Sequence, residues 1–222
     1  MNDAITELVR RHDPDRFLTA LFAPLAAIVM ALPAHAEIIP LSDLSRYLNG
    51  LTTAESDFTQ VNADGSISTG TIKIKRPGRM RFEYAPPDAS LVLASAGQVA
   101  IFDAKSNQPP EQYPLTRTPL NLILSPTVDL ARANTVVGHA EVEGTTRVAV
   151  QDPEHPEYGS IELVFTDQPL QLRQWIITDD MGAQTTVILG NLAASADFPP
   201  WVSTTGMLWA LAKAARRASA CE

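Results

Sequence analysis

The strongest constraint on the fold is a period-two alternation of apolar and polar residues that begins near residue 57. Successive side chains of a strand point to opposite faces, so each alternating run predicts a strand with one buried face. Turn signals such as Asp167-Gln168-Pro169 and Asp180-Met181-Gly182 separate the runs. We count about ten runs joined mostly by short turns. They predict an antiparallel meander, a sheet curled toward a barrel.

The segment KIKRPGRMRFEY, residues 73–84, sets the register of one hairpin. A two-residue loop at Pro77-Gly78 would pair Ile74 with Arg81 and so mix apolar and charged residues on one face. A shift of one residue pairs Ile74 with Met80 instead. In that register one face collects five apolar side chains, those of Ile72, Ile74, Met80, Phe82 and Tyr84. The hairpin before it pairs Val61 with Ile67 and sets Phe58 against Gly70.

The same register places Arg76 in the loop, at the rim of the apolar face. A guanidinium keeps its charge and offers five hydrogen-bond donors. Arg76 could therefore bind backbone carbonyls of a covering helix or the head group of a ligand. The alternative is a solvated loop arginine that contacts nothing.

Two stretches break the period of two and favour helices. Leu41, Leu44, Leu48 and Leu51 recur at helical spacing in residues 38–51. Residues 118–125, TPLNLILS, place Thr118 at a capping position and Pro119 at the first helical position. Two helices are too few to cover the whole sheet, so we expect them to cover a groove.

The N-terminal region has the features of a secretory signal. An apolar run over residues 17–32 follows Arg10, Arg11 and Arg16, and the A-x-A arrangement of Ala34 and Ala36 predicts cleavage after Ala36. Acidic residues offset the arginines, and an uncleaved anchor is the alternative, although the run is short for a membrane span. We expect residues 1–36 to be a signal peptide, residues 37–202 to form one domain, and the Ala-rich residues 203–222 to be a C-terminal extension of unknown role. The exported protein is expected in the periplasm.

Composition narrows the classes of function. The net charge of −8 makes the chain a poor partner for nucleic acid. A single cysteine, Cys221, excludes an internal disulfide, and none lies near the cleavage site to carry a lipid anchor. No nucleophile, zinc or phosphate-loop motif is present, so we expect no cofactor and no enzymatic activity. The acidic and histidine side chains within DPEHPEY (152–158) could hold a metal ion, but Pro153 and Pro156 favour a polar surface loop instead.

Five fragments stand out along the chain, namely FTQ (58–60), RPGRMRFEYAPP (76–87), LVLASAGQVAIFD (91–103), YPLTRTPLNLILS (113–125) and LRQWIITDDMGAQTTVILGNL (172–192). Together they resemble the LolA family of periplasmic lipoprotein carriers, over about residues 40–200. The resemblance departs at Ser95-Ala96-Gly97, where an aspartate precedes the glycine in the family, and the tail after Trp201 has no counterpart.

The resemblance implies an unclosed β-barrel with a helical lid and an apolar cavity between them. It implies a carrier that takes acylated lipoproteins from an inner-membrane ABC exporter and passes them to an outer-membrane acceptor. In the family, the arginine matched by Arg76 helps to hold the lid shut when no cargo is bound, and Met80 and Phe82 match cavity positions. The alternation of faces, counted along the chain, adds further cavity candidates, namely Ile72, Ile74, Tyr84, Leu91, Leu93, Phe102 and Leu122. We expect a monomer.

Two other proteins of this fold are alternatives. An outer-membrane receptor would carry a lipidated cysteine after its signal, which this sequence lacks. An envelope lipid-binding or stress-sensor domain of the same fold stays open as an alternative to the carrier.

Overall fold

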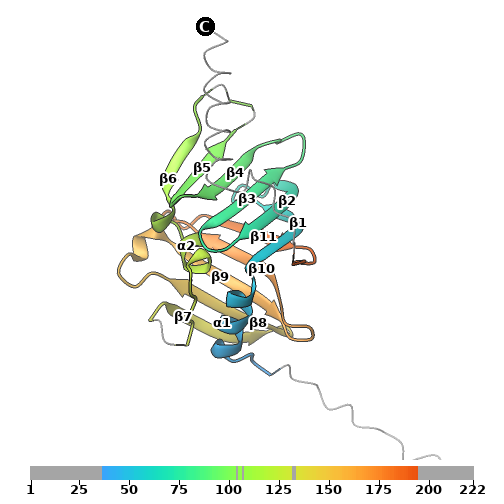
Figure 1. Cartoon of the computed structure of the whole chain (residues 1–222), viewed down its shortest axis with the longest axis vertical. Coiled ribbons are helices and arrows are strands. Elements are labelled where there is room, and N and C mark those ends of the chain that lie inside the picture. The colour runs from blue at the N-terminus through green and yellow to red at the C-terminus, as the bar shows by residue number, and fades with distance from the viewer. Residues whose placement is uncertain (1–36, 104, 107, 132–133, 195–222) are drawn as a thin grey trace, which may run out of the picture. The chain divides into compact units, whose positions relative to one another are not determined.

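The computed structural model describes residues 37–194 except 104, 107, 132 and 133 (Figure 1). The predicted signal peptide, the predicted extension at 203–222 and Cys221 lie outside the described residues. Within the described part of the chain, no helix combines the length and the apolarity needed to cross a bilayer. The helices are α1 (Leu41–Gly50) and α2 (Leu120–Leu124), with 3₁₀ turns at Leu115–Arg117 and Pro156–Tyr158. The strands are β1 (Thr53–Val61), β2 (Ile67–Lys75), β3 (Arg79–Tyr84), β4 (Leu91–Ser95), β5 (Gln98–Phe102), β6 (Glu111–Pro114), β7 (Val136–Val142), β8 (Thr145–Gln151), β9 (Ser160–Thr166), β10 (Gln171–Thr178) and β11 (Gln184–Leu189).

All eleven strands belong to one antiparallel sheet in the order β6-β5-β4-β3-β2-β1-β11-β10-β9-β8-β7. The order consists of two meanders, β1–β6 and β7–β11, that are joined by the pairing of β1 with β11. The sheet does not close, because β6 and β7 are its two edges. The predicted fold class, a mainly antiparallel and unclosed sheet with a few helices, is confirmed. The strand that the alternation missed is β6, which has only four residues and no buried position.

The turns lie where the turn signals predict them. Ala96 and Gly97 both have positive φ, 53° and 76°, as a two-residue hairpin turn of type I′ requires. Residues 167–170 join β9 to β10, and residues 179–183 join β10 to β11. The loop between β2 and β3 consists of residues 76–78, as the hairpin register predicts.

Both predicted helices form, and both are shorter than predicted. α1 begins only after Pro40, whose ψ of 140° is extended, and a residue before proline is itself disfavoured in a helix. Pro119 occupies the N-cap of α2, and Thr118 does not cap it, because its hydroxyl donates instead to the carbonyl of Leu115 at 2.8 Å. The prediction that Thr118 caps the helix is therefore wrong.

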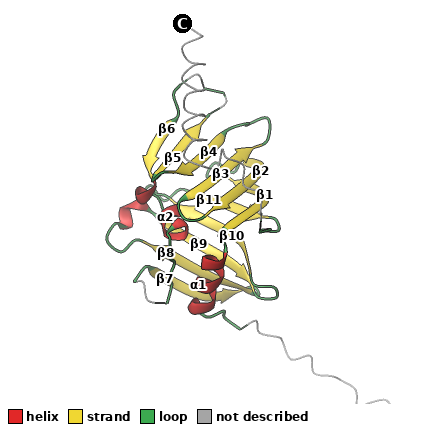
Figure 2. Cartoon of the chain, viewed as in Figure 1, coloured by secondary structure: helices red, strands yellow, loops and turns green. Residues whose placement is uncertain are grey.

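One face of the sheet, called here the inner face, packs against the two helices. Figure 2 shows both helices in front of the strands. Leu44 and Leu48 from α1 and Ile123 and Leu124 from α2 belong to the same buried cluster as the inner-face side chains. The core therefore lies between the sheet and the helices that cover it.

Candidate functional site

On the inner face, aromatic side chains from β1 and β3 meet across β2. The predicted register is confirmed, because Ile72 pairs with Phe82 and Ile74 pairs with Met80. These four side chains are buried, with at most 6% of each exposed. Gly70 lies between Phe58 and Tyr84, and the ring of Phe58 meets the rings of Tyr84 and Phe82 edge to face at 5.2 and 5.3 Å. The hairpin thus contributes a continuous apolar wall.

Three of the predicted cavity residues lie on the opposite face of the sheet. Leu93 pairs with Arg81, and Leu91 pairs with both Glu83 and Phe102. Leu91, Leu93 and Phe102 therefore form a separate small cluster with Ala100. Their assignment to the inner face is wrong. The alternation of faces cannot be extended from one strand to the next when the register across the loop is unknown, because a slip of one residue exchanges the two faces.

Val92 and Ala94 take the inner-face positions on β4, opposite Phe82 and Met80. Sequence reasoning missed them because the run LVLAS is apolar at nearly every position and gives no alternation to follow. On α2, Leu122 is half-buried and packs against the main core, on the side where the cavity was predicted.

Arg76 binds the C-terminal ends of both helices. Its Nη1 donates to the carbonyl oxygen of Leu48 in the last turn of α1. Its Nη2 donates to the carbonyl oxygen of Ser125, the residue that follows α2, at 2.7 Å, and to Oδ1 of Asn49 at 3.2 Å. The last carbonyls of a helix have no partner within the helix and carry partial negative charge, so a guanidinium suits them. Arg76 is therefore not a solvated loop residue.

Partial burial lowers the pKa of Arg76 below its ordinary value, through desolvation of the charged form. An arginine stays protonated after such a shift at any physiological pH. The contact with the helices is consequently a charge-assisted one, which is stronger than a hydrogen bond between neutral groups.

The backbone of the same loop contacts the same segments. The amide of Arg76 donates to the carbonyl of Thr52 at 2.8 Å, and the amide of Gly78 donates to the carbonyl of Leu124 at 2.9 Å. The loop of residues 76–78, called here the latch, therefore contacts both helix ends through its backbone and its guanidinium.

Asn49 and Ser45 on α1 continue this network and were not found as site residues from the sequence. Asn49 exchanges two hydrogen bonds with the backbone of Val128, at 2.8 and 2.9 Å. Ser45 accepts from the amide of Leu130 at 2.9 Å. In the sequence, Asn49 reads only as the stop signal before Gly50, and partners about 80 residues away leave no local pattern.

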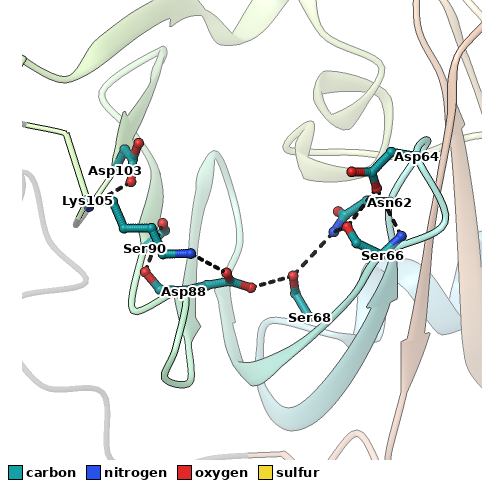
Figure 3. Close-up of polar contacts among 8 residues, drawn as sticks. All are labelled: Asn62, Asp64, Ser66, Ser68, Asp88, Ser90, Asp103 and Lys105. Atoms are coloured by element: carbon teal, nitrogen blue, oxygen red, sulfur yellow. Dashed lines mark hydrogen bonds and ion pairs between the residues drawn. The ribbon is translucent and has the colours of Figure 1, made fainter.

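The far end of the inner face is polar. Figure 3 shows Ser68 of β2 donating to Oδ2 of Asp88 at 2.6 Å, while Lys105 lies 3.1 Å from Oδ1 of the same carboxylate. The hydrogen bonds from Ser68 and Lys105 lower the pKa of Asp88. Asn62 donates to Ser68 at 3.3 Å and joins the β1–β2 turn to this row. The apolar wall therefore runs from a cationic latch at one end to a hydrogen-bonded polar row at the other.

An open groove of about 480 Å³ lies between α1 and the β9–β10 turn. None of the predicted cavity residues lines it, because those of the inner face pack between the sheet and the helices, and the other three lie on the opposite face of the sheet. In this structure the helices therefore cover the apolar side chains of the inner face. The groove is lined by Asp43, Arg46, Tyr47, Gly50, Leu51 and Leu170.

The acidic loop at 152–158 satisfies its own polar groups. Asp152 accepts from the amide of Glu154 at 2.9 Å, and Nδ1 of His155 lies 2.9 Å from a carboxylate oxygen of Glu157. The ring of His155 stacks on Tyr158. Among the described residues, no three His, Cys, Asp or Glu side chains are arranged to hold a metal ion.

These features define a class of protein: an open antiparallel sheet whose apolar inner face lies under two short helices, with a hairpin arginine bound to the end of each. Residues 49–202 match the family described as outer membrane lipoprotein carrier protein LolA. This chain belongs to that family, which confirms the resemblance found in the sequence.

The relatives that carry this description are distant in sequence. An outer-membrane lipoprotein carrier protein from Chromobacterium violaceum is 26% identical over 187 residues, which cover 79% of this chain and 87% of the relative. One from Methylococcus capsulatus is 26% identical over 184 residues, 79% of this chain and 88% of the relative. A solved LolA superfamily protein from Nitrosomonas europaea gives a TM-score of 0.41 at 5% identity, covering 76% of this chain and 99% of that chain.

Proposed function

We propose that this chain is a periplasmic carrier that binds the acyl chains of lipoproteins released from the inner membrane and delivers them to the outer membrane. The observation that carries the proposal is a predominantly apolar wall covered by two helices whose ends are bound by one arginine. Membership of the lipoprotein-carrier family supports it.

The energetics of an acyl chain fit such a wall. Each CH₂ that leaves water gains about 0.8 kcal/mol, so the chains of one lipoprotein cannot cross an aqueous space uncovered. The latch consists of a few hydrogen bonds, each worth about 1 kcal/mol net, so the helices can be displaced at modest cost. The acyl chains of the cargo then cover the apolar wall that the displaced helices leave exposed.

The partners in this proposal are an inner-membrane ABC exporter and an outer-membrane acceptor. The sequence contains no nucleotide-binding motif, so the energy for loading would come from the exporter. The role requires no catalysis. Delivery to the periplasm would follow cleavage after Ala36.

The experiment uses purified protein and the hydrophobic dye ANS. We expect the protein to bind the dye, and a diacylated lipopeptide to displace it at saturation, because both need the inner face. The same peptide without its acyl chains should leave the fluorescence unchanged. If saturating lipopeptide does not alter the dye signal, the inner face is not the binding site.

Arg76→Leu tests the latch. We expect a folded protein that either retains lipopeptide in a transfer assay or fails to load it, because the two helix ends lose their shared partner. Arg79→Leu is the matched control, since Arg79 begins β3 in the same hairpin but lies on the other face, opposite Lys75. Loading and release at the wild-type rate by Arg76→Leu would remove Arg76 from the proposal.

A further inference from the structure

At β7 and β8 the inner face carries three polar residues among apolar ones, namely Thr146, His139 and Glu141. Glu141 pairs with Thr146, and its carboxylate accepts from the amide of Gly144 in the β7–β8 turn at 2.7 Å, which leaves the pair Thr146 and His139 to be explained. Thr146 alternates with Val148 and Val150 along β8, and all three side chains are buried. His139 on β7 pairs with Val148 and therefore shares their face. Polar groups on a buried apolar face need hydrogen-bond partners, so this pair calls for a specific explanation.

Both side chains bind the backbone of Ile39. The amide of Ile39 donates to Oγ1 of Thr146 at 3.0 Å, and Nε2 of His139 lies 3.0 Å from the carbonyl oxygen of Ile39. A carbonyl only accepts, so Nε2 carries the hydrogen, which either the neutral or the charged ring can supply. The side chain of Ile39 is itself buried in the core. A residue just before α1 is thus held by its amide, its carbonyl and its side chain.

This contact lies at the opposite end of α1 from Arg76. At its C-terminal end α1 continues through Leu51 and Thr52 into β1, so the chain itself keeps that end on the sheet. Arg76 binds this already attached end, at Leu48 and Asn49. Residues 37–40 before α1 form no strand, so side-chain contacts hold the N-terminal end. The ten residues of α1 span about 15 Å. The N-terminal end is therefore the end that moves furthest when the helix rotates about its attachment to β1.

We propose that Thr146 and His139 form a second latch, which holds the N-terminal end of α1 on the sheet. When it releases, α1 swings about Leu51 and Thr52, and the inner face opens from the β7–β8 side. The role of α1 as a lid rests on the proposed function, whereas the contact between Ile39 and the second latch can be tested without any cargo.

Amide hydrogen exchange on the purified protein tests the second latch. Thr146→Val keeps the shape of the side chain but leaves the amide of Ile39 unpaired. We expect about tenfold faster exchange at Ile39, Asp43 and Leu44, the amides that depend on this end of α1. The amide of Leu51 at the other end should stay within about twofold of wild type. Thr146→Ser, which keeps the hydroxyl, should show the wild-type pattern.

His139 gives an independent pair of variants if Thr146→Val does not fold. His139→Leu should accelerate the same amides, and His139→Gln, which keeps a side-chain N–H donor, should restore much of their protection. Unchanged exchange at Ile39 in Thr146→Val, or equal acceleration at both ends of α1, would overturn the second latch.

Loading of a diacylated lipopeptide separates this inference from the proposed function. With the second latch weakened, we expect loading to be several-fold faster than in wild type, and Thr146→Ser to match wild type. If no form of the protein binds lipopeptide, the proposed function fails, and the exchange gradient along α1 still decides whether the latch exists. Accelerated exchange without faster loading would overturn the swing as the route of opening.

Discussion

At the scale of single residues, Gly70 determines how closely two strands and one aromatic ring approach each other. A Cβ at this position would overlap the carbonyl oxygen of Glu83 and lie 2.8 Å from Cε1 of Phe58. The hairpin register alone predicts the pairing of Phe58 with Gly70, and the structure confirms it. The aromatic rings of the inner face can therefore pack as they do only because Gly70 has no side chain.

We expect Gly70→Ala to lower the free energy of unfolding by about 2–3 kcal/mol, because the added methyl group overpacks a filled site. Urea denaturation followed by far-UV circular dichroism measures the change. Gly50→Ala is the matched control, since nothing lies within 4 Å of a Cβ at the last residue of α1, and its change should stay below about 1 kcal/mol. Wild-type stability in Gly70→Ala would contradict this packing.

At the scale of elements, two tyrosines fasten neighbouring parts of the fold. The hydroxyl of Tyr47 on α1 accepts from the amide of Leu172 at 3.1 Å, where a bulge interrupts the β9–β10 ladder. The hydroxyl of Tyr84 on β3 donates to Oε1 of Gln60 on β1 at 2.8 Å. Burial raises the pKa of both hydroxyls above their ordinary value of 10.0. The fold therefore depends on neutral tyrosine at both positions, because ionisation would place a charge in a partly buried site, and Tyr84 also needs its proton to donate to Gln60.

This dependence predicts a loss of stability at alkaline pH. A tyrosine of the unfolded chain loses its proton near pH 10, before the same residue does in the folded protein. The stabilisation is therefore complete below about pH 10 and is lost as the pH rises through the folded pKa values. We expect the urea midpoint to fall as the pH rises above about 10, and to fall less steeply in Tyr47→Phe with Tyr84→Phe. An identical slope in the double variant would contradict this assignment.

At the scale of the whole sheet, the two meanders share one core although they are hydrogen-bonded only where β1 meets β11. Phe82 of β3 meets Trp175 of β10 edge to face, with ring centroids 6.2 Å apart. Side chains from the two meanders thus pack directly on each other. We expect them to unfold together.

Phe82→Ala should lower the free energy of unfolding by about 3–5 kcal/mol, because it leaves a cavity between the two meanders. Phe102→Ala removes an equal side chain from the other face of the sheet, where Phe102 is only partly buried, and should cost less than about 2 kcal/mol. Urea denaturation of the two variants compares the costs. Equal losses of stability in the two variants would contradict the assignment of Phe82 to the buried inner face and of Phe102 to the opposite face.

Much of the fold was predictable because its pattern is local. Alternation and turn signals predict the strands, and the three-residue loop at 76–78 leaves one register that keeps charged residues off the apolar face. Where a loop is longer, as at residues 85–90, the same reasoning loses the parity, and Leu91, Leu93 and Phe102 were assigned to the wrong face.

The sequence by itself determined the meander, the β2–β3 register, the two helices and the place of Arg76 at a rim, since each depends on residues that are near neighbours in the chain. Only the tertiary structure decided what the polar residues hold. Arg76 reaches Leu48 across 28 positions and Ser125 across 49, and Thr146 reaches Ile39 across 107. Hydrogen bonds between such distant residues exist only once the sheet has brought them together, so no periodicity in the chain records them.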